Sequence, residues 1–282
     1  MNLKSIGLIL ASLLMIVAAG ADAAGRKRIS QDELDIIYSK ADIIKELEFG
    51  RNMAAQLLGD YQLIKNQELL KYINLVGQVV LQQSSRQEIN YYFGVIHADE
   101  VNAYATPGGY IFLTTGALAL MQSEAELAGV LAHEIAHVAE RHIVKALEIR
   151  AADDSSTGLL GQITSGGSSS ATVLFNQAMG KAFDILYGSG LRIEDEFSAD
   201  ELGILLTSLA GYDTAPYFNY LERIKPIVED AGQRLSRTHP SFDDRIQHLK
   251  TIYQGQGLLE LGGSINRQRL LRYKKLDIED EQ

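Results

Sequence analysis

The sequence predicts an α+β fold that is mainly helical and carries a small β-sheet. Apolar residues recur at steps of three and four along most of the chain, the spacing of helices with one buried face. Strand-forming residues are confined to 89–98 and 102–113, between longer helical segments. Because helices and strands do not alternate, the pattern does not favour parallel βαβ units.

The composition is that of a folded, acidic protein. Of 282 residues, 46% are hydrophobic and 22% are charged, and the net charge of -10 argues against nucleic acid as a partner. The sequence contains no cysteine, which excludes disulfides and thiolate ligands within it. Any metal must be held by His, Asp and Glu. The candidate histidines are His97, His133, His137, His142, His239 and His248.

The first residues resemble an export signal. Lys4 precedes an apolar run over 6–19, and small residues follow at 21–23. We therefore expect a signal peptide over 1–23 and an exported protein, periplasmic if the source is a Gram-negative bacterium. The alternative is an uncleaved anchor. No later stretch reaches the roughly 18 apolar residues of a membrane span, so we expect no integral membrane domain in the mature chain.

The elements before residue 150 are expected in a clear order. Residues 30–82 are helical in pattern, and 89–98 form a strand. The turn signal Pro107-Gly108-Gly109 predicts a hairpin or strand pair around it. Ser123 and Glu126 match a capping box, which predicts the start of a long helix over 123–149.

The second half is expected to be helical except for one low-complexity stretch. Residues 154–170 are rich in Ser and Gly, and are interpreted either as a mobile lid or as a plain linker. Residues 254–282 are expected as a polar tail or peripheral helix. Helices are predicted over 193–210, 214–229 and 242–253, with Gly211 ending the first of them.

The sequence His133-Glu134-Ile135-Ala136-His137 lies within the predicted helix over 123–149. Histidines four residues apart share one helical face, so both rings can bind a single metal ion. Glu134 is turned about 100° from His133 and can act as the base that takes a proton from a metal-activated water. The alternative is a helix with two solvated or core-satisfied histidines, which its apolar and small flanking residues make less favourable.

A catalytic metal site usually has a third protein ligand. His142 is rejected because a continuous helix would turn it about 140° away from His137, and it is expected as a surface or capping histidine. Glu196 is the better candidate, since it would complete a His₂Glu set, which favours zinc. Asp200, one turn later, would then hold a ligand histidine. From spacing alone, a solvated acidic turn explains both carboxylates equally well.

Together these segments resemble the gluzincin peptidases that include HtpX, the CAAX prenyl protease and the OMA-type mitochondrial protease, and most of all the exported BepA-like branch. Besides the metal motif, the matching residues are Asn102 to Ala105 with Gly108-Gly109, Ser123 to Ala128, Glu196 to Asp200, and Thr238-His239-Pro240 with Arg245. The resemblance implies a zinc metallopeptidase domain over 30–253. It implies one zinc ion on His133, His137 and Glu196, with Glu134 as base and Asp200 supporting a ligand.

The resemblance also implies where substrate would bind. Asn102, Ala103, Gly108 and Gly109 resemble the edge on which an extended peptide is laid, although an ordinary internal hairpin is the alternative. His239 is hypothesised to be either an oxyanion stabiliser or a reversible fourth ligand. Arg245 is expected to bind either a substrate carbonyl or a structural carboxylate.

The resulting functional prediction is an exported zinc metalloendopeptidase that cleaves unfolded or damaged envelope proteins. The BepA-like resemblance adds the outer-membrane assembly machinery as a candidate partner. The alternative is a zinc-bound, largely latent chaperone or assembly factor for envelope proteins.

Overall fold

The computed structural model describes residues 40–147, 149, 168–230, 238–239, 242–256 and 262–279. The expected signal peptide and nearly all of the low-complexity stretch lie outside these ranges. The described chain confirms the predicted α+β class, with many helices and a three-stranded sheet.

The helical pattern expected over 30–82 forms two helices, α3 (Lys40–Asp60) and α4 (Gln67–Leu81). The segment between them is extended, and Leu63 there pairs with Ile96. Asn66 starts α4, because its side chain accepts a hydrogen bond from the backbone N–H of Leu69. The prediction of continuous helical structure over 30–82 was therefore wrong between Asp60 and Gln67.

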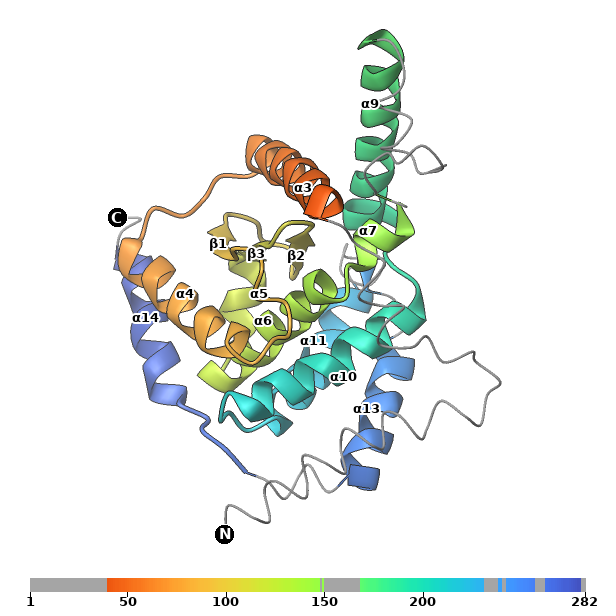
Figure 1. Ribbon diagram of the computed structural model, residues 1–282. Coiled ribbons are helices and arrows are strands. Elements are labelled where there is room, and N and C mark those ends of the chain that lie inside the picture. Colours follow the sequence, from red (N-terminus) through yellow and green to blue (C-terminus); the bar gives the residue numbers. More distant parts are fainter. Residues whose placement is uncertain are drawn as a thin grey trace. The chain divides into compact units, whose positions relative to one another are not determined.

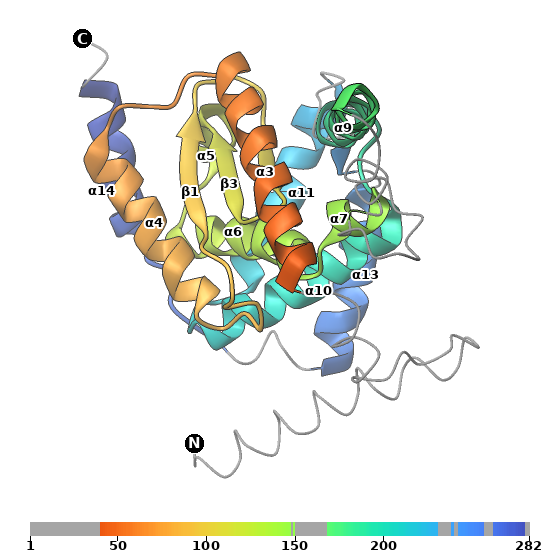
Figure 2. The same cartoon turned by 45° about the horizontal axis from the view of Figure 1, so that its top comes forward.

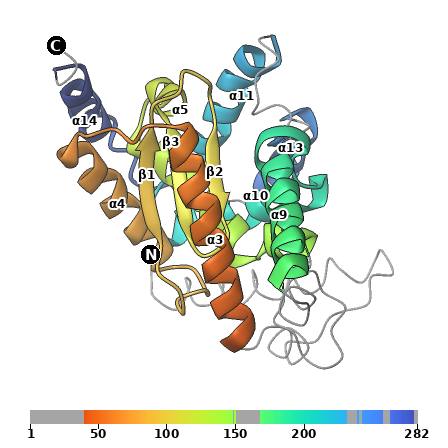
Figure 3. The ribbon, with the colours of Figure 1, turned by 90° about the horizontal axis from the view of Figure 1, so that it is seen from above.

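The sheet contains β1 (Tyr92–Ile96), β2 (Ala103–Thr106) and β3 (Tyr110–Thr114), in the order β1-β3-β2 (Figure 3). β2 and β3 form the predicted antiparallel hairpin, whereas β1 runs parallel to β3. Gly108 and Gly109 form the hairpin turn with φ of 76° and 91°, a backbone conformation that favours glycine. Among the described strands, β2 is thus an edge strand.

Helices cover both faces of this sheet. Helix α6 (Glu124–Ala139) crosses one face, and α3 lies over the other (Figures 1 and 2). Nearly every residue of α6 is buried, so this helix is the centre of the apolar core. Helices α4, α10 (Ile193–Leu209) and α11 (Ala215–Asp230) pack around α6.

The predicted helix over 123–149 begins as expected but is interrupted. Ser123 accepts a hydrogen bond from the Glu126 N–H, which confirms the cap. The helix ends at Ala139, Arg141 adopts a left-handed conformation with φ of 58°, and the chain resumes as α7 (His142–Ala146). This change of direction re-aims every side chain that follows it.

The remaining elements complete the helical part. Gly211 has the positive φ expected of the residue that ends α10. Within the segment expected as a tail or peripheral helix, α14 (Arg267–Glu279) packs against α4, where the rings of Tyr273 and Tyr72 stack 4.1 Å apart. None of the described helices is both long and apolar enough to cross a membrane. The other elements are α5 (Thr115–Leu120), α9 (Ser168–Asp184), a π-helix over Ile185–Ser189, α13 (Phe242–Gln256) and α14 (Arg267–Glu279).

Candidate metal centre and active site

Helix α6 places the two motif histidines side by side. His133 and His137 lie one turn apart, and their Nε2 atoms are 2.9 Å from each other. Both rings are almost fully buried. Since a buried polar ring needs a partner, two facing nitrogens at this distance indicate a shared ligand or a shared proton.

Helix α10 adds the carboxylate to the same point. Glu196 is fully buried, with one oxygen 3.5 Å from His133 Nε2 and the other 3.5 Å from His137 Nε2. The close approach of the two helices depends on Gly203, where an added Cβ would lie 3.1 Å from the backbone nitrogen of His133. Because Glu196 is fully buried, the solvated-turn alternative for it is wrong.

His239 completes a group of four. Its Nδ1 lies 2.9 Å from Glu196 Oε2, and its ring faces both motif histidines. One candidate ligand atom from each of His133, His137, Glu196 and His239 lies within 4.8 Å of the others. His239, for which the sequence left two roles open, thus lies beside the other candidate ligands.

The donor set fits a metal ion. Glu196 Oε1 is buried and has no hydrogen-bond partner among the described residues. A cation would stabilise imidazole nitrogens that converge on a carboxylate oxygen lacking a hydrogen-bond donor, and two imidazoles with one carboxylate suit zinc.

The outer nitrogen of His133 faces a second carboxylate. Asp200 Oδ1 lies 2.9 Å from His133 Nδ1, the arrangement that the sequence predicted. Arg245 donates two hydrogen bonds to Asp200, of 2.7 and 2.8 Å, and its Nη1 lies 3.2 Å from Glu196 Oε2. Tyr217 donates a further hydrogen bond of 2.8 Å to Asp200. Of the two roles expected for Arg245, these contacts match binding to structural carboxylates.

The charges of these neighbours set the ionisation of the site. Burial alone would raise the pKa of Glu196, but the charges of His239 and Arg245 hold it well below its usual range. Burial lowers the pKa of His137, which keeps its ring in the neutral form that can bind a metal.

The other two motif residues shift toward the protonated form. Burial opposes charge on His133, yet the Asp200 carboxylate raises its pKa to about 9, so a metal would have to displace a proton there. Burial raises the pKa of Glu134 above its usual range. A carboxylate with a raised pKa is the stronger proton acceptor, as a general base requires.

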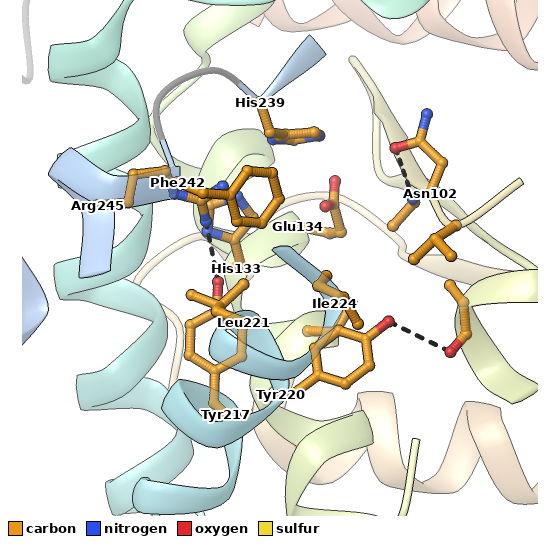
Figure 4. Close-up of a pocket in the computed structure, with 14 residues that line it drawn as sticks. Asn102, His133, Glu134, Tyr217, Tyr220, Leu221, Ile224, His239, Phe242 and Arg245 are labelled. Atoms are coloured by element: carbon orange, nitrogen blue, oxygen red, sulfur yellow. Dashed lines mark hydrogen bonds between the residues drawn. The ribbon is translucent and has the colours of Figure 1, made fainter. Parts of the chain in front are cut away.

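An apolar pocket opens beside Glu134 (Figure 4). One wall comes from α11, and β2 with the residue before it forms another. Asn102 lies on this wall; its Oδ1 accepts the Ala103 N–H at 2.9 Å, and its buried Nδ2 has no partner among the described residues. The main apolar lining residues are Val130, Tyr220, Leu221, Ile224 and Phe242.

The structure brings some of the predicted substrate residues to this pocket and not others. Asn102 and Ala103 line it together with Glu134. Gly108 and Gly109 lie in the hairpin turn, where Gly108 approaches Leu47 of α3 and Gly109 approaches the backbone of Asn90. Their close contacts are with the fold rather than with the pocket.

Sequence reasoning missed the contribution of α11. Tyr217, Tyr220, Leu221 and Ile224 share one face of this helix and reach the pocket or Asp200. Their spacing of three and four residues indicated a buried helical face. No signal in the sequence indicated that this face lines a cavity rather than the core.

The expectation of a surface position for His142 is wrong. The ring is buried, its Nδ1 lies 2.8 Å from His137 Nδ1, and its Nε2 lies 2.9 Å from Glu140 Oε2. The rejection assumed a continuous helix, whereas the left-handed residue Arg141 turns the chain back toward His137. His142 therefore contacts a candidate ligand without being one.

Comparison with known proteins agrees with this geometry. The sequence pattern of peptidase family M48 matches residues 67–253, more than half of the chain. The chain belongs to peptidase family M48. The resemblance inferred from the motifs is thereby confirmed at the level of the family.

Several relatives carry the names of metalloproteases. The β-barrel assembly-enhancing protease of Yersinia pestis is 29% identical over 87% of this chain and 52% of its own length. The mitochondrial metalloendopeptidase OMA1 of Schizosaccharomyces pombe is 27% identical over 72% of this chain and 61% of its own. Metalloprotease LoiP of Escherichia coli K12 is 24% identical over 68% and 74%. The chain spans about half the length of the β-barrel assembly-enhancing proteases that it matches.

Proposed function

We propose that this M48 chain is a zinc-dependent endopeptidase. The observation that carries the proposal is the convergence of His133, His137 and Glu196 on one buried point, where Glu196 Oε1 lacks a hydrogen-bond partner among the described residues. His133, His137 and Glu196 would hold one zinc ion, and Asp200 would orient His133 through its Nδ1.

When bound, zinc supplies a Lewis acid that polarises a carbonyl and lowers the pKa of water. Glu134 would take the proton of the attacking water and pass it to the leaving amine. Its burial and raised pKa support this role, because a carboxylate with a raised pKa is the stronger proton acceptor. The two hydrogen bonds from Arg245 would hold the Asp200 carboxylate in place beside His133 during this proton transfer.

The substrate is proposed to be an extended polypeptide. β2 is an edge strand among the described residues and runs past Glu134, so a peptide pairing with it would be held by main-chain hydrogen bonds. The unpaired amide of Asn102 would donate to a substrate carbonyl. The apolar pocket would receive a side chain next to the scissile bond. Main-chain pairing suits unfolded or damaged proteins.

The cellular setting is part of the same proposal. The apolar run over 6–19 supports export, and the names of the first relatives support a role in β-barrel assembly in the cell envelope. On this basis the substrates would be envelope proteins, and the assembly machinery would be a partner.

We further propose that His239 acts as a reversible fourth ligand. Its place in the four-residue group supports a latent arrangement in which it occupies the position that the attacking water needs. His239→Ala is then expected to raise peptide hydrolysis and weaken zinc binding. A fall in hydrolysis with unchanged zinc binding would favour the oxyanion role instead. No change in either property would exclude both roles.

Glu134→Gln provides the main test. Hydrolysis of an unfolded protein should fall by about 100-fold to 10,000-fold, the range typical of a lost general base, while zinc content stays at one per chain. Glu201→Gln, at an exposed carboxylate on α10, is the matched control and should remain active. Unchanged hydrolysis by Glu134→Gln would overturn the mechanism. Loss of hydrolysis with the biological role preserved would favour a chaperone.

A further inference from the structure

The two motif histidines have unequal surroundings at their outer nitrogens. His133 Nδ1 faces the carboxylate of Asp200 directly, at 2.9 Å. His137 Nδ1 faces a second imidazole, that of His142, at 2.8 Å. His142 Nε2 in turn lies 2.9 Å from Glu140 Oε2. His137 thus reaches a carboxylate only through another ring.

The protons of this chain can be assigned from the chemistry of imidazole. A His137 ring that binds a metal through Nε2 carries its proton on Nδ1 and donates it to His142. His142 must then accept at Nδ1, which leaves its own proton on Nε2, directed at Glu140. The reverse assignment, with the His142 proton on Nδ1, would leave His137 protonated at Nε2 and unable to bind a metal.

Glu140 selects between these two arrangements. A carboxylate accepts hydrogen bonds only, so it requires a proton on His142 Nε2. Ser198 of α10 donates its hydroxyl to the same oxygen of Glu140, which holds that carboxylate in place. Ser198 lies between Glu196 and Asp200 on α10, so one helix supports both motif histidines.

We propose that Glu140 and His142 are positioning residues that fix His137 in the tautomer able to bind metal. The proposal rests on the proposed zinc site and adds a support that reaches His137 by way of a second histidine. The left-handed backbone at Arg141 makes the contact possible, because it returns His142 to the face that His137 occupies.

The direct test is zinc affinity, measured by competition with a chromogenic chelator on the full chain. His142→Phe keeps an aromatic ring but removes both nitrogens, and should weaken zinc binding by about 10-fold or more, the range seen for outer partners of metal ligands. His142→Asn keeps an acceptor near the Nδ1 position and should recover part of that loss. Val144→Ala, at another buried residue of α7, is the packing control and should bind zinc like the wild type.

Nitrogen-15 NMR of the histidine rings adds a readout that a purely structural role would not move. The zinc-bound wild type should show protonated Nδ1 in His137 and protonated Nε2 in His142. Glu140→Gln is a second variant in case the His142 variants do not fold, because the Glu140 side chain is 31% exposed. It should also weaken zinc binding.

The outcomes separate this inference from the peptidase proposal. A wild type that binds no zinc would overturn both. Normal zinc affinity in folded His142→Phe or, if only that variant folds, in Glu140→Gln would overturn the positioning role alone. An equal loss of affinity in Val144→Ala would do the same, because it would trace the effect to the packing of α7.

Discussion

Helix α6 carries a buried polar cluster near each end, and the two clusters are built in opposite ways. The N-terminal cluster surrounds Glu124, whose carboxylate accepts three hydrogen bonds and forms an ion pair with Arg269. The metal cluster near the other end consists of acceptors that face each other. The hydrogen-bond donors are Tyr72 and Tyr212, at 2.9 Å each, and Asn266 at 3.1 Å, and the guanidinium of Arg269 lies 2.7 Å from the carboxylate.

This difference separates a structural cluster from a binding site. In the N-terminal cluster donors and acceptors balance, so the buried carboxylate is satisfied within the protein. In the metal cluster His133 Nε2, His137 Nε2 and Glu196 Oε1 approach each other, and the last of these lacks a hydrogen-bond partner among the described residues. Burial and polarity are common to both. An excess of acceptors directed at one point is what distinguishes the site.

The largest expected effect comes from removing the acceptor charge of the metal cluster. Glu196→Gln should weaken zinc binding by more than the roughly 10- to 100-fold that changes in outer partners cause, because a ligand itself is lost. The zinc-free protein should still fold, since Arg245 keeps its two hydrogen bonds to Asp200.

Thermal melts with and without added zinc measure both properties of Glu196→Gln together. Zinc should raise the melting temperature of the wild type, because a ligand that binds only the folded state stabilises it, and should leave the variant unchanged. An equal zinc-dependent rise in both proteins would contradict the assignment of Glu196 as a ligand.

The reciprocal change should affect stability and spare the metal. Glu124→Ala removes the acceptor shared by three hydrogen-bond donors and the partner of one exposed guanidinium, and is expected to lower the free energy of unfolding by about 3–5 kcal/mol. Urea denaturation measures this loss. Zinc affinity of the folded variant should stay within about twofold of the wild type, because Glu124 is more than two helical turns from His133.

Glu68→Ala is the control for Glu124→Ala. Glu68 occupies the first turn of α4 as Glu124 occupies the first turn of α6, but its side chain is exposed. Its replacement should change the free energy of unfolding by less than about 1 kcal/mol. Similar losses in the two variants would mean that the helix terminus, and not the hydrogen-bonded cluster, stabilises the fold.

A smaller effect is expected from a substitution in the pocket, because its wall there is apolar and no hydrogen bond is lost. Ile224→Phe would fill part of the pocket with a larger side chain. It should reduce kcat/KM about 10-fold for peptides with Leu or Phe next to the scissile bond, relative to peptides with Ala there. Ile227→Phe, at a residue of the same helix that is 39% exposed, is the control. Equal effects on all peptides would show that the pocket does not select side chains.

The comparison of the two clusters also shows how far sequence reasoning extends. His133, Glu134 and His137 follow from the helical period, because contacts four residues apart are local. Glu196 lies on a second helix, and its spacing could not separate a ligand from a surface carboxylate. Its convergence on α6 depends on tertiary packing through Gly203.

The error at His142 has a similar physical origin. Arg141 is not a residue type that favours the left-handed region, so nothing local predicted the break in the helix. Distant partners hold this conformation, since Arg141 contacts Glu46 of α3 at 3.3 Å and Glu88 at 3.1 Å. The donors to Glu124 were missed for the same reason, because they come from three separate parts of the chain.

The smallest effect concerns the pH dependence of the N-terminal cluster. Burial, together with the charge of Glu124, raises the pKa of Tyr72 above its usual value near 10. The folded state therefore favours the neutral phenol. The resulting stability is fully present below about pH 10 and is lost as the pH rises further, by at most about 1.4 kcal/mol per pH unit for this group.

Tyr72→Phe removes the titrating hydroxyl while keeping the ring that stacks on Tyr273. The variant should be less stable than the wild type at pH 8, because the hydrogen bond to Glu124 is lost, but should lose less stability between about pH 9 and pH 11. Urea denaturation at these pH values measures the difference, with Tyr92→Phe, at a half-exposed ring, as control. Parallel curves of stability against pH for Tyr72→Phe and wild type would mean that the raised pKa of Tyr72 does not stabilise the folded state.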